Sequence, residues 1–471
     1  MSLTIDKSPL FQDIGDITKQ PTNTYNSTLE TEIKLHTVGK DLDYLDGIAV
    51  AGIKIYRDYV NNISDYIEIQ ISCLLGTYVY DIYPYLDNME VSLYMIRQEQ
   101  LNGKPTVVKE RFKAVYLLDK NSEVPTTTNV SKDDLNQNLP IVLTLQLIDR
   151  SAEALRIKTV QGSFDKRINP KNKDMTPGNF IKSIISEQSD KVLIENKPSI
   201  DRVDIEPTDN KEELKAITIP SGTRLVELPE YLQLKSSGVY NSGIGNYIQR
   251  FAPSITETIK GYFVYSLYNS KKYNTSEHKI IFYSPPTSNY AVTDVTYKYD
   301  GKILRVVAHS NPAINDMKES LIMSTGGGYR SSNANSFTKK PIIMTEKGPK
   351  FSKQGLVTEI IYKDRADGIN FAPGKGVSAN HFAMTSEVLK KAGKTIPLRI
   401  TNVDPDFIYP GASCKVVYEG KTKSVDEFYG VIHRAVIVLA QQALNMQHIY
   451  TSPRISLSSQ IDLEIFVAGE Q

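Results

Sequence analysis

The chain has 471 residues, a length that allows two to four domains. Its 55 Lys and Arg nearly balance its 54 Asp and Glu, so the net charge of +1 gives no reason to expect a nucleic-acid or anionic-membrane partner. The 28 Tyr and 14 Phe suit β-strands and protein interfaces. Only two cysteines occur, Cys73 and Cys414, which favours folding in a reducing cytoplasm over a disulfide-stapled fold.

Residues 1–29 carry few apolar side chains and are predicted to be an N-terminal arm. The first residues have neither the basic nor the apolar region of a signal peptide. No run of about 18 apolar residues occurs, so we expect no membrane insertion.

A period-two alternation of apolar and polar residues predicts strands in the next part of the chain. It is strict over residues 67–73, recurs over 91–95 and 141–147, and is weaker over 112–116. Residues 30–165 are therefore predicted to form one antiparallel β domain. The turns or loops expected between its strands are Tyr83-Pro84, Asn102-Gly103 and residues 121–138.

The pattern changes after residue 165. Thr176-Pro177 predicts a helix start, followed by one apolar helical face over residues 180–185. The charged stretch 195–215 is predicted to be an exposed loop or linker. Short alternating runs at residues 262–268 and 279–283 predict strands, so residues 166–300 are expected to form a middle α+β domain.

Residues 301–394 are predicted to be a loop-rich region that partly joins the last domain. It contains the low-complexity stretch Ser324–Asn335, predicted to be a loop, and a short helix expected at Ser386–Ala392 that stops at Gly393. Residues 395–471 return to β patterning and are predicted to form a second β domain.

Four short matches between the first and last domains, in the same order, suggest a duplication. Each domain has a Tyr-Pro before a strand, an acidic-x-Phe-x-x-Val stretch, a proline and an Ile-Asp. The matching positions are Tyr83-Pro84 with Tyr409-Pro410, Glu110–Val115 with Asp426–Val431, Pro140 with Pro453, and Ile148-Asp149 with Ile461-Asp462.

Searches for common catalytic, phosphate-binding and metal sites give only background matches. The stretch Gly368–Gly376 has one residue too many for a phosphate-binding loop and lacks its hydroxyl residue, and Gly326–Gly328 lacks dinucleotide-loop spacing. The histidines at 36, 278, 309, 381, 433 and 448 show no zinc-ligand spacing.

The remaining candidate groups also favour structural roles. His433 is predicted to be a satisfied or edge-exposed histidine within an apolar strand, and both cysteines are predicted to lie in the core. Asp404 and Asp406 are predicted to form a solvated turn, and no Gly-x-Ser-x-Gly elbow occurs. We therefore predict no enzymatic activity, no catalytic or metal-binding residues and no cofactor.

Several stretches resemble the central hub proteins of phage baseplates, a family shared with contractile secretion and injection spikes. The most similar stretch runs from Met384 to His433, with its helix, the Tyr409-Pro410-Gly411 turn and the return strand Phe428–His433. The segments Tyr450–Leu457, Leu145–Glu153 and Thr176–Phe180 are also similar.

The resemblance implies a mainly β fold with a few short helices, in which two related antiparallel, tail-tube-like β-barrels flank the middle region. It implies a homotrimeric ring that adapts a hexameric tail tube to a trimeric central spike and forms part of the tail conduit. The implied partners are the tail tube, central spike, tape measure and other baseplate (wedge) proteins, with DNA only as passing cargo. The implied location is the virion tail baseplate, assembled in the host cytoplasm.

Two alternatives remain at this level. One is a tail-associated peptidoglycan hydrolase, which would need a catalytic constellation. The other is a receptor- or glycan-binding tail-tip protein, for which the absence of Trp is mildly unfavourable.

Overall fold

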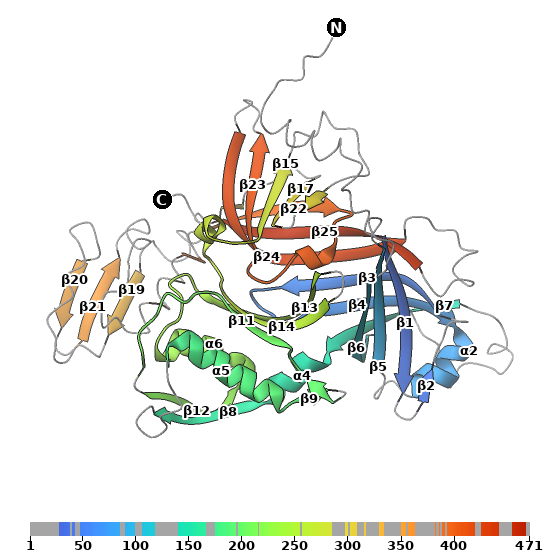
Figure 1. Ribbon diagram of the computed structural model, residues 1–471, viewed down its shortest axis with the longest axis horizontal. Coiled ribbons are helices and arrows are strands. Elements are labelled where there is room, and N and C mark those ends of the chain that lie inside the picture. Colours follow the sequence, from blue (N-terminus) through green and yellow to red (C-terminus); the bar gives the residue numbers. More distant parts are fainter. Residues whose placement is uncertain are drawn as a thin grey trace, which may run out of the picture.

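A computed structural model shows a large mixed sheet with a smaller α/β body on one side of it (Figure 1). It describes residues 28–37, 40–42, 48–84, 90–98, 106–117, 140–165, 175–194, 196–214, 216–254, 257–284, 297–299, 302–308, 315–316, 329–333, 350–354, 357–362, 382, 386, 389–390, 393–419, 425–441 and 455–467.

The large sheet has 15 strands and takes its members from both ends of the chain. In spatial order these strands are β16 (Tyr297–Tyr299), β17 (Ile303–Val307), β15 (Lys279–Ser284), β23 (Ser413–Glu419), β24 (Val425–Gln441), β3 (Ile48–Asp58), β4 (Tyr66–Leu74), β7 (Pro140–Asp149), β6 (Thr106–Leu117), β5 (Glu90–Gln98), β1 (Thr28–Thr37), β25 (Ile455–Val467), β22 (Lys394–Thr401) and β18 (Asn315–Asp316), with β2 (Lys40–Leu42) paired to β1.

Two long strands, β24 with 17 residues and β25 with 13, connect the ends of this sheet. One edge of β24 pairs with β23 over residues 425–431 and then with β3 over 434–440, while its other edge pairs with β25. The outer edge of β25 likewise pairs with β1 over residues 455–457 and with β22 over 460–467. The pairings therefore return to β24 by way of β3, β4, β7, β6, β5, β1 and β25.

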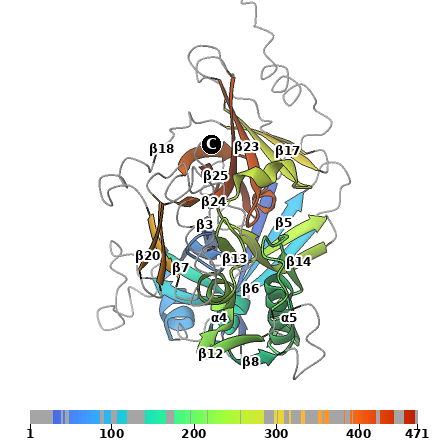
Figure 2. The ribbon, with the colours of Figure 1, turned by 90° about the vertical axis from the view of Figure 1, so that its left-hand side faces the viewer.

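The second body contains helices α4 (Arg150–Ile157), α5 (Pro177–Asp190) and α6 (Leu228–Tyr231), packed on two small sheets. One sheet has the order β11 (Arg202–Ile205), β14 (Glu257–Ser266), β13 (Ile244–Ser254), and the other pairs β8 (Thr159–Asp165) with β12 (Ala216–Arg224). In Figures 1 and 2 the β8–β12 ribbon lies at the opposite end of the molecule from β23.

The remaining elements are short. They are α2 (Leu75–Thr77), η1 (Tyr78–Ile82), β9 (Leu193–Ile194) with β10 (Lys197–Pro198), η3 (Leu225–Glu227), η4 (Leu232–Ser236), η5 (Ser270–Asn274), η8 (Pro405–Phe407), and a separate sheet of β19 (Tyr329–Asn333), β21 (Val357–Tyr362) and β20 (Lys350–Gln354).

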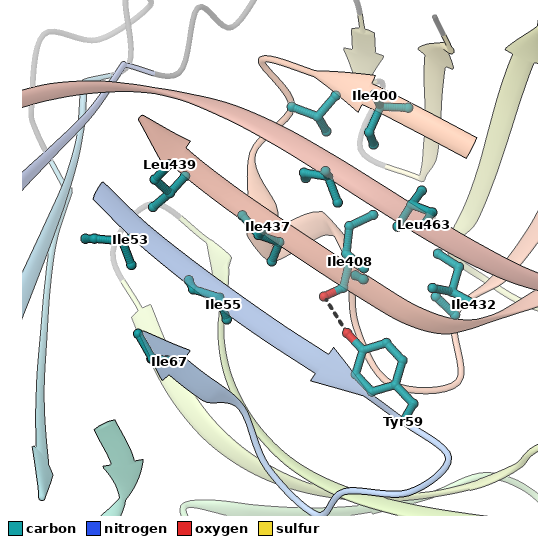
Figure 3. Close-up of a cluster of buried hydrophobic side chains, with 14 of the residues drawn as sticks. Ile53, Ile55, Tyr59, Ile67, Ile400, Ile408, Ile432, Ile437, Leu439 and Leu463 are labelled. Carbon is teal, nitrogen blue, oxygen red and sulfur yellow. Dashed lines mark hydrogen bonds between the residues drawn. The ribbon is translucent and has the colours of Figure 1, made fainter. Parts of the chain in front are cut away.

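Two apolar cores result from this arrangement. The first lies under the large sheet, where every second residue of β4 is buried and contacts residues of β3, β24 and β25. Figure 3 shows part of it, with Ile53, Ile55, Ile67, Ile437, Leu439 and Leu463 on neighbouring strands and Ile408 in the same cluster. The second core lies between α5 and the small sheets and includes residues from Ala152 to Val264.

The predicted mainly β fold with few short helices is confirmed. The helix expected after Thr176 is α5, which begins with Pro177 and is capped by Thr176 through the Asn179 N–H at 3.4 Å. The two expected barrels, however, are not two separate closed sheets, because β24 and β25 each pair with strands of both predicted domains.

Several local predictions need correction. Residues 202–205, placed in the predicted exposed linker, form β11, which pairs in parallel with β14 and buries Val203. Tyr83 and Pro84, predicted as a turn or loop, continue the helical segment of residues 75–82, and residues 329–333 of the predicted low-complexity loop form β19. The strand β15 falls within the predicted middle domain but pairs with β23 of the last domain.

Some predictions fall outside the described residues. These are the arm over residues 1–27, the loops at Asn102-Gly103 and residues 121–138, and most of the stretch Ser324–Asn335. Of the predicted helix at 386–392, the described residues 386, 389 and 390 are helical, and the Gly393 N–H donates to the Leu389 carbonyl at 3.1 Å. The division into five segments remains a prediction.

The close approach of β24 to β25 depends on Gly430. A Cβ atom there would lie 2.5 Å from Ile465 Cγ2 and 2.6 Å from the Phe466 carbonyl oxygen. We predict that Gly430→Ala lowers the free energy of unfolding by about 1–3 kcal/mol, the range for overpacking a core. Urea denaturation followed by circular dichroism measures this change.

The matched control is Gly52→Ala in β3, where a Cβ would meet its nearest neighbours at 3.6 and 3.9 Å. That substitution should leave the free energy of unfolding unchanged or slightly higher. Equal losses in the two variants would contradict the steric explanation.

Candidate assembly site at the junction of two strand sets

The first and last predicted β domains each contain four strands with the same spatial order. The first strand set has the order β4-β7-β6-β5, and the second strand set has the order β22-β25-β24-β23. All neighbours within each set are antiparallel. In both sets a helical segment, α2–η1 or η8, separates the first strand from the next along the chain.

The residue register supports one of the four sequence matches and not another. Phe112 pairs with Val91 across β6 and β5, and Phe428 pairs with Val416 across β24 and β23. The Ile-Asp match is not equivalent in position. Asp149 lies opposite Phe112, whereas Asp462 lies opposite Val436, beyond the bulge in β24.

The change of partner along β24 occurs at a β-bulge. Val431 is the last residue paired with β23, and Arg434 is the first paired with β3. The register with β25 shifts between Ile432 and Arg434, so His433 is the extra residue of the bulge. At the bulge, β24 changes its partner from β23 to β3, which pairs with β4 of the first strand set.

His433 is buried at this bulge, with 5% of its surface exposed. Its Nε2 lies 2.9 Å from the Leu267 carbonyl oxygen, so the neutral ring with its proton on Nε2 donates that hydrogen bond. The ring stacks on Phe466 at a centroid distance of 4.9 Å and meets Tyr268 edge-on at 5.4 Å. Burial lowers the pKa of His433 to about 4.

A buried polar cluster joins β3, the partner of β24 beyond the bulge, to the segment that precedes β23 in the chain. Arg57 Nη1 donates to the carbonyl oxygens of Pro405 (2.6 Å) and Ile408 (2.9 Å). The same Ile408 oxygen accepts from Gln249 Nε2 at 2.9 Å, and the Tyr59 hydroxyl lies 3.2 Å from it (Figure 3). One carbonyl of the η8 segment is thus held by side chains from β3, the turn after it and β13.

Asp65 balances the charge of Arg57. Its carboxylate accepts from Arg57 Nε at 3.3 Å and from the Tyr247 hydroxyl at 2.9 Å. Burial alone would lower the pKa of Arg57, but Asp65, together with Tyr59, Asp406 and Tyr247, outweighs it and the pKa is raised. Burial raises the pKa values of Tyr59 and Tyr247, so both phenols remain hydrogen-bond donors.

Two further ion pairs connect elements of the α/β body to neighbouring segments. Lys260 of β14 lies 2.7 Å from Asp149 at the end of β7, and the same Asp149 caps α4 through the Ala152 N–H at 2.8 Å. Lys272 of η5 lies 2.8 Å from Glu206, and burial lowers the pKa of Lys272. Asp149 and Lys272 are buried, whereas Lys260 and Glu206 are partly exposed, so breaking either pair would leave a buried charge without its partner.

The Tyr409-Pro410-Gly411 turn requires glycine at position 411. The Ala412 N–H donates to the Tyr409 carbonyl at 3.2 Å, and Gly411 adopts a φ of +70°, which closes a turn in front of β23. A Cβ at Gly411 would also lie 2.7 Å from the ring of Tyr265, which is fully buried. The turn therefore packs directly against β14.

Most of the other candidate residues from the sequence analysis that the structure describes are buried. Cys73 and Cys414 are free and lie in the core as predicted, and burial raises the pKa of Cys73 to about 12. Asp404 is not in a solvated turn, because it is 7% exposed and its carboxylate caps η8 through the Asp406 N–H at 3.0 Å. His433 is buried and hydrogen-bonded, and His278 is exposed.

No group of three His, Cys, Asp or Glu side chains gathers in metal-binding geometry anywhere in the described ranges. Within the same ranges, none of the helices has the length and apolar character that crossing a membrane requires. The two glycine-containing stretches that were rejected as phosphate- or dinucleotide-binding loops, Gly326–Gly328 and Gly368–Gly376, fall outside the described residues.

The sequence did not reveal the polar cluster. Arg57 and Ile408 are 351 positions apart, and Tyr247 and Asp65 are 182 apart. An arginine within the alternating apolar stretch of β3 is the one local signal that a buried charge occurs there, but the sequence does not identify its partners.

Comparisons with known proteins give matches only among solved structures. No family model and no curated protein matches the chain. The chain is similar to a tail protein from Neisseria meningitidis MC58, with a TM-score of 0.42 and 10% identity over 92% of this chain and 96% of that one. It is also similar to the 43 kDa tail protein of prophage MuSo2 from Shewanella oneidensis, with a TM-score of 0.45 and 12% identity over 92% and 98%.

A third similar structure is the half-lidded Francisella PdpA-VgrG complex, with a TM-score of 0.37 and 9% identity over 98% of this chain and 62% of that one. All three TM-scores lie below 0.5, so the proposals that follow rest on the strand pairings and contacts of this chain.

The buried neutral His433 predicts a pH dependence of stability. The unfolded chain binds a proton on this ring below its ordinary pKa of 6.5, whereas the folded chain binds it only near pH 4. The free energy of unfolding should therefore fall as pH drops from 6.5 to 4, by about 3 kcal/mol for this group. Urea denaturation across this pH range measures the decrease.

The comparison variant is His433→Gln, whose amide can still donate to Leu267 but does not titrate. The unsubstituted chain should lose about 3 kcal/mol more than this variant between pH 7 and pH 4. The exposed His278→Gln serves as the control and should behave like the unsubstituted chain. An H433Q variant with an undiminished pH dependence would show that His433 is not the responsible group.

Proposed function

We propose that the chain is a structural protein of a phage-type tail, specifically a baseplate hub that works by docking other proteins and not by catalysis. The observation that supports this most directly is the common order of the two strand sets, β4-β7-β6-β5 and β22-β25-β24-β23, within one sheet. A chain with two similar units can form a ring of six units from three copies.

Such a ring solves a mismatch of symmetry. Its six similar units can contact the six subunits of a tail tube, while its true threefold symmetry can contact a trimeric central spike. The ring would surround part of the tail conduit, with DNA as passing cargo. In this proposal the tape measure protein and the baseplate wedge proteins are further partners, and the tail baseplate of the virion is the location.

A symmetry adaptor needs a fixed spacing between its two units, and the junction supplies it. β24 and β25 of the second strand set pair with β3 and β1, which in turn pair with β4 and β5 of the first strand set, so continuous backbone hydrogen bonding connects the two sets. The Arg57–Ile408 hydrogen bond adds a second connection, between β3 and the segment before β23. This rigidity favours a scaffold over a hinged protein.

The use of the buried charges also supports a structural role. Arg57, Asp149 and Lys272 each contact an opposite charge and a backbone or hydroxyl group of another element. Buried ionisable groups arranged in this way stabilise contacts between elements, whereas a catalytic group needs access to a substrate.

The oligomeric state tests this proposal. Light scattering on the purified chain after size exclusion, alone and mixed with its spike protein, should give a species with three times the 52.8 kDa mass of one chain. A chain that stays monomeric at high concentration in both samples would contradict the ring. Zymography on peptidoglycan tests the rival hydrolase function separately, and reproducible clearing would support that rival.

A further inference from the structure

A groove of about 500 Å³ lies over β4, β3 and β24, and the buried Arg57 also contributes to its lining. Its lining includes Tyr56 and Asp58 of β3, Tyr66 and Glu68 of β4, and Arg434 of β24. These side chains come from three neighbouring strands, and Tyr56 pairs directly with Tyr66 and Asp58 with Arg434. The groove therefore has a fixed floor of sheet backbone.

The two phenols of the groove point to one carboxylate. The Tyr56 hydroxyl lies 3.1 Å from Glu68 Oε2, and the Tyr66 hydroxyl lies 3.1 Å from Glu68 Oε1. The two rings are tilted, with their centroids 5.4 Å apart. Burial, together with the Glu68 charge, raises the pKa of Tyr66 to about 12, so the phenol stays protonated and donates.

This arrangement leaves one acceptor position on each oxygen of Glu68. An ionised carboxylate offers about four lone-pair positions, and the two phenols use one on each oxygen. A guanidinium group presents two parallel N–H bonds that match one acceptor on each oxygen. The tyrosine ring faces beside it are favourable neighbours for a cation.

The cations near the groove already have other partners. Arg434 lies 2.9 Å from Asp58 and 3.4 Å from Glu464, and Arg57 is directed to Asp65 and the η8 carbonyls. In the part of the chain that the structure describes, Glu68 forms no ion pair. Lys54, its cross-strand neighbour, is exposed.

A second tyrosine–glutamate pair in the same chain shows what such a group accepts. The Tyr429 hydroxyl lies 3.2 Å from Glu427 Oε2, again two positions apart on one strand. There the cation comes from the chain itself, because Lys415 of β23 lies 2.5 Å from Glu427 Oε1 and 6.0 Å from the Tyr429 ring centroid. At Glu68 the described residues supply no such cation.

We propose that the Tyr56–Tyr66–Glu68 groove is a docking site for an arginine side chain of a partner protein. The site goes beyond the proposed hub role and does not depend on trimer formation. The guanidinium binds Glu68 through two hydrogen bonds, and the tyrosine rings flank it.

A peptide titration tests the site. A labelled Gly-Ser-Arg-Ser-Gly peptide is titrated with the purified chain at low salt by fluorescence polarisation, alongside its Lys and citrulline counterparts. The Arg peptide should bind most tightly and the uncharged citrulline peptide most weakly. Glu68→Gln should weaken Arg-peptide binding about tenfold, the value of roughly one charge-assisted hydrogen bond.

Two variants separate this site from general surface charge. Glu427→Gln changes a similar tyrosine-linked glutamate that already has a cation partner, and it should leave the affinity unchanged. Lys54→Ala removes a competing cation and should leave the affinity unchanged or higher. Thermal denaturation and light scattering confirm that each variant keeps its fold and oligomeric state.

The proposal is overturned by equal binding of the Arg and Lys peptides, or by equal losses in the Glu68→Gln and Glu427→Gln variants. Failure of Arg-peptide binding in a chain that still forms a trimer would reject this site and leave the hub function standing. Arg-peptide binding by a chain that stays monomeric would support this site and reject the hub function.

Discussion

The structure depends on one constraint, the passage of two long strands through both halves of the large sheet. β24 and β25 each pair with strands from the beginning and the end of the chain. A strand of ordinary length, about five or six residues, could serve only one half. Because β24 also pairs with β3 and β25 also pairs with β1, the two strand sets cannot separate without breaking these backbone pairs.

The bulge at His433 allows β24 to pair first with β23 and then with β3 while its side chains stay packed. A strand that changes partner must also change direction, and the extra residue at a bulge bends and twists it. Phe466 and Tyr268 pack on the His433 ring, and the Leu267 carbonyl satisfies its one donor. Arg57 and the Ile408 carbonyl then attach the next segment. The cost of burying these polar groups is offset because each one is paired.

The sequence predicted the elements much better than their connections. Strict alternation identified β4 and β7, and the Thr176-Pro177 start identified α5, because these signals lie within a few neighbouring residues. The β11 strand was missed because a charged, proline-containing segment was interpreted as a linker, although it is held by pairing with β14. The Ile-Asp match was misleading, since register depends on a bulge that no short motif encodes. The Arg57 cluster joins residues hundreds of positions apart, so its partners could not be inferred from local patterns.

The pairings that connect the two strand sets predict that they unfold as one cooperative body. Native-state hydrogen exchange with mass spectrometry, at increasing denaturant, tests it most directly by measuring the free energy of opening for each strand. We expect peptides from β4 and β7 and peptides from β22 and β25 to open together, with one common free energy. Two distinct opening free energies, with one strand set exchanging while the other stays protected, would contradict it.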